Sequence, residues 1–173
     1  MTSGENIHNA FAVVFKTLES IEKLMSKCRT ELDENKYYMP DKRFMRYSSD
    51  QHWEGWIYWS FILLFQRCDD GEKMDNGWID GPVYAVEINV DAETCDEPKL
   101  YIVKMEFEGM NEWSERCSPS NHSLFYDAIH EEKLYSFWGL KKVTKSEHNL
   151  TDVTQDNYKD IIFGTIEKLS RQL

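Results

Sequence analysis

Acidic side chains on two neighbouring predicted strands have the spacing best suited to binding or chemistry. Apolar and polar residues alternate through residues 82–91 and again through 99–109, which predicts an antiparallel hairpin with one buried face. We expect the other face to be polar and mostly acidic. It would carry four carboxylates and one lysine: Glu87, Asp91, Lys104, Glu106 and Glu108.

Three interpretations of this face are open. It can be a solvated surface with a cross-strand pair between Glu87 and Lys104. It can bind another protein. It can also hold a metal ion that activates water in a nuclease or hydrolase. Such nucleases place an acid on one strand and an acid-x-lysine on the next, whereas this chain has Glu87-Ile-Asn89 and Lys104-Met-Glu106. The order therefore favours the first two interpretations over the metal site.

A second group of candidate residues lies near residue 122. If residues 122–133 form a helix, Asp127, His130 and Glu131 share one face, and Cys117 precedes them as a further ligand or a nucleophile. No zinc-protease signature, GxSxG motif or Gly-rich phosphate loop accompanies them. We therefore predict no catalytic residue, no metal ligand and no cofactor, and leave the question of enzyme activity open with the balance against it.

Tryptophans are frequent in this chain, at six in 173 residues. Trp78 and Trp113 lie in loop-like stretches between acidic residues, where tryptophans can anchor a protein interface. Packing in the core or beneath a loop is the alternative. Trp56 and Trp59 belong to a longer apolar run and are expected in the core.

The overall charge indicates which partners suit the chain. Its 31 acidic and 20 basic residues give a formal net charge of −11, which repels nucleic-acid phosphates and suits a basic protein. The N-terminal residues lack the pattern of a signal peptide, and no apolar run reaches the roughly 18 residues of a membrane span. We therefore expect a cytoplasmic protein with a protein partner and no membrane contact.

The clearest element is an N-terminal helix with an apolar stripe. The stripe steps by four and three residues through Ile7, Phe11, Val14, Leu18, Ile21, Met25, Cys28 and Leu32. This spacing is typical of a helix that packs on its own sheet, and also of a seam between two chains. A homodimer through the 7–32 helix is therefore possible.

The rest of the chain predicts the fold class. Residues 53–67 form an apolar, aromatic run that favours a strand covered on both faces over a buried helix. Residues 151–173 have the periodicity of a closing helix. We predict a single α+β domain over residues 1–173. Its mainly antiparallel sheet of four to five strands would be covered on one face by the long N-terminal and C-terminal helices.

These observations predict a non-enzymatic, acidic protein-binding module that engages a basic protein partner. An inhibitor, an immunity or anti-defence factor and a chaperone-like protein all fit this description. The alternatives are a metal-dependent nuclease or hydrolase that uses the hairpin carboxylates, and a small-ligand-binding regulatory domain with an aromatic pocket.

Overall fold

The computed structural model describes residues 2–40, 44–46, 56–113, 122–130 and 139–172. These described residues form three α-helices and a six-stranded antiparallel sheet, which confirms the predicted α+β class and adds a strand to the predicted number. The chain divides into two compact units, residues 1–32 (unit 1) and residues 33–173 (unit 2). The prediction of a single domain over residues 1–173 stays a prediction.

Unit 1 consists of one long helix, α1 (Ser3–Thr30). Its N-terminus is a capping box: the Glu5 amide donates to the Thr2 hydroxyl at 3.3 Å, and the Thr2 amide donates to the Glu5 carboxylate at 2.6 Å. The predicted helix is therefore confirmed. Its first half exposes four large apolar side chains: Ile7, Phe11, Val13 and Phe15.

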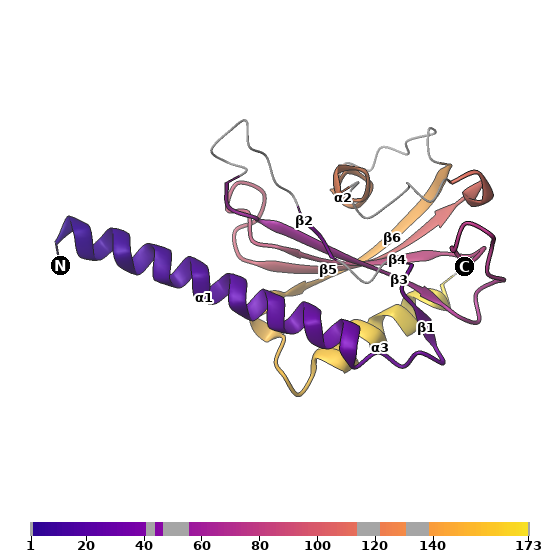
Figure 1. Ribbon diagram of the computed structural model, residues 1–173, viewed down its shortest axis with the longest axis horizontal. Helices are drawn as coiled ribbons and strands as arrows, with labels where there is room; N and C mark the ends of the chain where they lie inside the picture. The colour runs from indigo at the N-terminus through magenta and orange to yellow at the C-terminus, as the bar shows by residue number, and fades with distance from the viewer. Residues whose placement is uncertain (1, 41–43, 47–55, 114–121, 131–138, 173) are drawn as a thin grey trace. The chain divides into compact units, whose positions relative to one another are not determined.

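Unit 2 is built on the sheet. Its strands are β1 (Tyr37–Tyr38), β2 (Met45–Arg46), β3 (Ser60–Arg67), β4 (Val83–Asn89), β5 (Lys99–Phe107) and β6 (Leu140–Asn149). The strand order is β1-β3-β4-β5-β6, and every pair is antiparallel. The short strand β2 also pairs with β3, nearer its start than β1 does, so two short segments share one edge of the sheet (Figure 1).

Strand β3 confirms the interpretation of residues 53–67 as a strand rather than a helix within the described part of that run. Seven of its eight residues are buried, on both of its faces. The sequence is apolar on both faces because both are covered. Trp56 lies before the strand and is 72% exposed, so its predicted core position is wrong.

Helix α3 (Tyr158–Ser170) covers one face of the sheet. The ring of Phe163 contacts Phe65 of β3 and Tyr37 of β1, at centroid distances of 5.7 and 5.0 Å. The helix begins later than predicted, because residues 150–152 form a separate 3₁₀ turn. The predicted C-terminal helix is otherwise confirmed.

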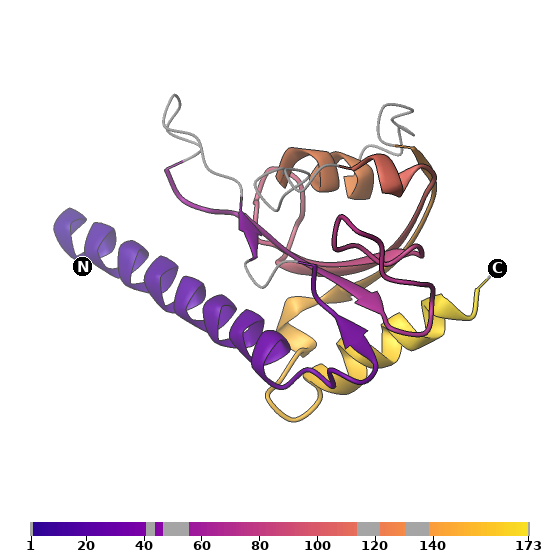
Figure 2. The same ribbon diagram turned by 45° about the vertical axis from the view of Figure 1, so that its right-hand side comes forward.

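Helix α2 (His122–His130) lies on the opposite face of the sheet (Figures 1 and 2). It packs against β3 and β6. Unit 2 therefore has three layers, with helices on both sides of the sheet. The prediction placed helices on one face alone, because it took the polar residues of the hairpin for a solvated surface.

The β4–β5 pairing places the predicted acidic residues on different faces. Glu87 lies opposite Tyr101, and Lys104 lies opposite Tyr84. Directly opposed residues share a face, so Glu87 is on the α2 side and Lys104 is on the α3 side. The predicted Glu87–Lys104 pair is therefore wrong. A change of register by one residue reverses every side chain of a strand, and alternation within each strand does not determine that register.

Candidate functional site

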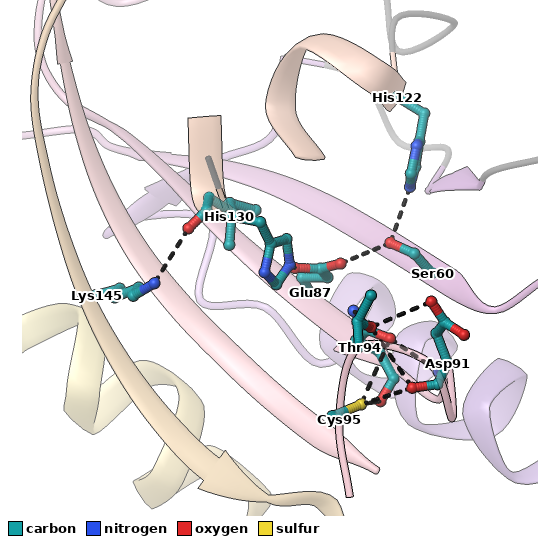
Figure 3. Close-up of polar contacts among 10 residues, drawn as sticks. Ser60, Glu87, Asp91, Thr94, Cys95, His122, His130 and Lys145 are labelled. Atoms are coloured by element: carbon teal, nitrogen blue, oxygen red, sulfur yellow. Dashed lines mark hydrogen bonds and ion pairs between the residues drawn. The ribbon is translucent and has the colours of Figure 1, made fainter. Parts of the chain in front are cut away.

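A buried carboxylate lies at the contact between α2 and the sheet. Glu87 of β4 has no exposed surface. One of its oxygens, Oε1, accepts a hydrogen bond from the Ser60 hydroxyl at 2.7 Å, and Oε2 lies 2.7 Å from His130 Nε2 (Figure 3). The Ser60 oxygen in turn lies 2.9 Å from His122 Nε2. We call these four residues the Glu87 centre.

The elements of unit 2 bring the four residues together. Ser60 begins β3 and Glu87 lies in the neighbouring strand, on the same face of the sheet. His122 and His130 are the first and last residues of α2, just over two turns apart, so both face the sheet. Tyr126 lies between them, stacked on His122 and tilted against His130, at centroid distances of 5.6 and 4.5 Å.

The hydrogen bonds determine where the protons lie. Ser60 has one hydroxyl proton and donates it to Glu87. The Ser60 oxygen must therefore accept the hydrogen bond from His122, which carries its proton on Nε2. His130 likewise donates from Nε2 to the other carboxylate oxygen. Both oxygens of the buried carboxylate thus have a donor.

Burial also shifts the pKa of two side chains at the centre, His122 and Tyr126. The pKa of His122 is lowered to about 4, first by burial and then by the nearby His130, so this imidazole is neutral at neutral pH. The pKa of Tyr126 is raised to about 12, first by burial and then by the Glu87 carboxylate. The aromatic stripe of α2 therefore adds no negative charge beside Glu87.

Serine, histidine and glutamate together suggest a nucleophilic triad, but the direction of these hydrogen bonds differs from that in a triad. A serine nucleophile gives its proton to a histidine base. Here Ser60 is fully buried, gives its proton to a carboxylate and accepts a hydrogen bond from His122. The arrangement instead gives each oxygen of a buried carboxylate a hydrogen-bond partner and holds both ends of α2 on the sheet.

The loop between β4 and β5 is tied down by its own side chains. The Asp91 amide donates to the Asn89 side chain at 2.9 Å, and the Glu93 amide donates to Asp91 at 3.0 Å. The Cys95 thiol lies 3.0 Å from the Asp91 carbonyl oxygen (Figure 3). Asp91, predicted as part of the acidic hairpin face, therefore helps to shape this loop.

A half-open hollow of about 400 Å³ lies beside this loop, and we call it the loop hollow. Its lining consists of Ala92, Glu93, Thr94, Cys95, Asp96, Glu97, Lys99, Tyr101 and Glu147. Four carboxylates and one ammonium group give this lining a formal charge of −3. Lys99 Nζ lies 3.1 Å from Glu147 and 3.4 Å from Glu97.

The predicted site residues do not include the lining of the loop hollow. The acidic run Glu93 to Glu97, which joins the two hairpin strands, is its local signal in the sequence. Glu147 joins it because β6 pairs with β5, which places Glu147 opposite Tyr101. No local signal relates residue 147 to residue 101, and the pairing of the strands is what brings them together.

The remaining predicted hairpin residues lie away from Glu87. Lys104 and Glu106 form an ion pair at 3.0 Å, and the Lys104 ammonium also donates to the carbonyl oxygen of Gln172, just beyond α3. Glu108 forms an ion pair with Lys141. The structure therefore brings Lys104 and Glu106 together but does not gather the predicted set into one surface.

Trp78 and Trp113 lie in the core rather than on the surface. Each is 6% exposed, and their rings meet at right angles with centroids 5.0 Å apart. Both belong to the apolar cluster on the α2 side of the sheet. The prediction that they anchor an interface at the surface is therefore wrong. The alternative, packing in the core or beneath a loop, describes both tryptophans.

The metal-dependent alternative requires Glu87 and Glu106 to converge. They lie on opposite faces of the sheet, so their carboxylates do not form a shared site. Within the described ranges no three His, Cys, Asp or Glu side chains gather as metal ligands. Glu131 and Cys117 lie outside the described residues. No described helix has the length and apolarity that a bilayer crossing needs.

Comparisons with known proteins identify no relative. No protein-family model, no curated protein and no solved structure matches this chain. The functional argument therefore depends on the geometry and charge of the chain itself.

Replacing Glu87 tests whether the Glu87 centre holds unit 2 together. Glu87→Ala removes the acceptor of the Ser60 and His130 donors and leaves a cavity, so we expect a loss of about 3 kcal/mol or more in the free energy of unfolding. Urea denaturation followed by tryptophan fluorescence measures it. The control Glu108→Ala removes an exposed carboxylate and should cost less than about 0.5 kcal/mol. Equal small losses in both variants would contradict the role of the centre.

The lowered pKa of His122 predicts a pH dependence of stability. The unfolded imidazole takes up a proton near its ordinary pKa of 6.5, whereas the folded one resists protonation down to about 4. The contribution of the neutral His122 to the free energy of unfolding is therefore complete above pH 6.5. It is lost as the pH falls from 6.5 to 4, by up to about 3 kcal/mol. Urea midpoints across this range should fall less steeply for His122→Gln than for wild type. The control His148→Gln should keep the wild-type slope, and a His122→Gln slope equal to wild type would contradict the assignment.

Proposed function

We propose that this chain is a non-enzymatic protein-binding module that engages a basic protein partner through unit 2. An inhibitor, an immunity or anti-defence factor and a chaperone-like protein are the classes that fit, acting in the cytoplasm. The distribution of charge supports this. Residues 1–32 contain four acidic and four basic residues, so the other 27 acidic and 16 basic residues place the whole net charge of −11 in residues 33–173.

Concentrated negative charge favours a basic partner for two reasons. Complementary potentials accelerate the encounter of two proteins, and they disfavour acidic competitors. The loop hollow supplies a concave part of this surface, with a formal charge of −3. Glu87 contributes nothing to it, because its carboxylate is buried and bonded within the Glu87 centre.

The two alternatives from sequence analysis receive less support. A nuclease or hydrolase using the hairpin carboxylates lacks the convergence of Glu87 and Glu106 that it needs. A ligand-binding domain with an aromatic pocket would need aromatic rings around a free space. Trp78 and Trp113 instead fill the core against each other.

Self-association through α1 is a second candidate, favoured by its exposed apolar side chains. Ile7 and Phe11 are 59% and 52% exposed, and they begin the heptad stripe that continues to Leu32. Unit 1 carries no net charge, so two copies of this helix do not repel each other. A homodimer through the 7–32 helix would present two copies of the acidic unit.

Affinity capture tests the binding of a basic partner. Tagged full-length protein should retain a stoichiometric basic protein from host lysate at low salt and release it as salt is raised. The variant Glu93→Lys/Asp96→Lys/Glu97→Lys should lose that partner. The matched control Glu19→Lys/Glu22→Lys/Glu31→Lys makes the same change in net charge on unit 1 and should keep it. Capture that is unchanged in the first variant, or lost equally in both, would contradict the proposal.

Light scattering tests the homodimer. Wild type at about 100 μM should have twice the 20.6 kDa chain mass, and Phe11→Glu should be a monomer because it places a charge in the apolar stripe. Val13→Glu is the control, since Val13 is exposed but lies outside the heptad positions. A monomeric wild type at that concentration would exclude this dimer.

A further inference from the structure

Tyr101 is a buried residue whose polar atom has no partner among the described residues. Its side chain lines the loop hollow and is only 8% exposed. Other buried tyrosines bond to carboxylates: the Tyr37 hydroxyl donates to Glu167 at 2.8 Å, and the Tyr84 hydroxyl donates to Asp70 at 2.9 Å. No described residue makes such a bond with Tyr101. The hydroxyl keeps exposed surface where the side chain lines the hollow, so it is available to a partner supplied from outside.

The surroundings of this hydroxyl are negative. Burial raises the pKa of Tyr101, the Glu147 carboxylate raises it further, and Lys99 opposes the rise. The hydroxyl is therefore protonated at neutral pH, and its oxygen is available to accept a hydrogen bond. Its environment disfavours an anion and favours a group that brings positive charge and N–H donors.

The carboxylates of the loop hollow are only partly neutralised. Lys99 forms ion pairs with Glu97 and Glu147. Glu93 and Asp96, which line the same hollow, form no ion pair with any described residue. A second cation could therefore enter without displacing Lys99.

We propose that the loop hollow receives a lysine or arginine side chain of the basic protein partner. Its charged end lies among the carboxylates, and one N–H donates to the Tyr101 hydroxyl. This inference rests on the proposed function and adds the chemistry of the contact. It also explains why a carboxylate-rich hollow contains a buried tyrosine.

The Glu87 centre positions Tyr101 for this role. The His130 ring meets the Tyr101 ring at 90°, with centroids 4.9 Å apart, and Glu87 holds His130 through its Nε2. The same carboxylate thus fixes α2 and, through His130, one side of the Tyr101 ring. Glu87 is a positioning residue for the hollow and does not contact the incoming cation.

Small probes test the hollow without knowledge of the partner. Full-length ¹⁵N-labelled protein is titrated with Nα-acetyl-lysine amide, Nα-acetyl-arginine amide and the neutral analogue Nα-acetyl-norleucine amide. We expect the two cations to shift the backbone amides of residues 92–97, 99, 101 and 147 with millimolar affinity, and the neutral analogue to leave them unchanged. Tyr101→Phe should weaken the cations about 3- to 10-fold, as the loss of one hydrogen bond predicts. The control Tyr84→Phe should bind as wild type does.

The outcomes separate this inference from the proposed function. Absence of shifts with either cation, or unchanged affinity in Tyr101→Phe, overturns the inference even if a basic partner is captured. Binding of spermidine without binding of the lysine and arginine probes also overturns it, in favour of a free polyamine. Probe binding that depends on Tyr101, with no basic protein captured, supports the hollow's preference for a cation and overturns the proposed function.

Discussion

The buried carboxylate of Glu87 is the constraint on which unit 2 depends. Moving a charge out of water costs several kcal/mol, and the cost is recovered only if every lone pair that faces the protein finds a donor. Ser60 and His130 supply those donors, and His122 supports Ser60. Three elements must therefore stay in place together: β3, β4 and the whole length of α2.

This requirement accounts for the composition of α2. Its contacts with Ser60 and Glu87 come from the two histidines at its ends, and a tyrosine lies between those histidines. Phe125 and Ile129 supply the apolar contact on the neighbouring part of the helix, within the core that holds Trp78 and Trp113. The helix is thus positioned by polar contacts and stabilised by apolar ones.

The carboxylates of this chain consequently serve two different purposes. Glu87 is inside the protein, fully bonded, and contributes to structure. Those of the β4–β5 loop and Glu147 surround the loop hollow and give it negative charge. Tyr101 connects the two groups, because it packs on His130 and lines the hollow. A rigid wall costs a partner less ordering on binding, which suits a recognition surface.

Sequence by itself determined the elements whose signal is local. The period of residues 7–32 predicted α1, the aromatic run predicted β3, and alternation predicted the hairpin of β4 and β5. Tertiary structure decided which faces met. Alternation within β4 puts Glu87 on the same face as Ala85. Only the register against β5 shows that Tyr101, and not Lys104, shares this face. The Ser60–His122 contact joins residues 62 positions apart, and Glu147 reaches Tyr101 only through the β5–β6 pairing. Such contacts depend on strand register and on the helix that covers each face, and no periodic pattern in the sequence encodes either of them.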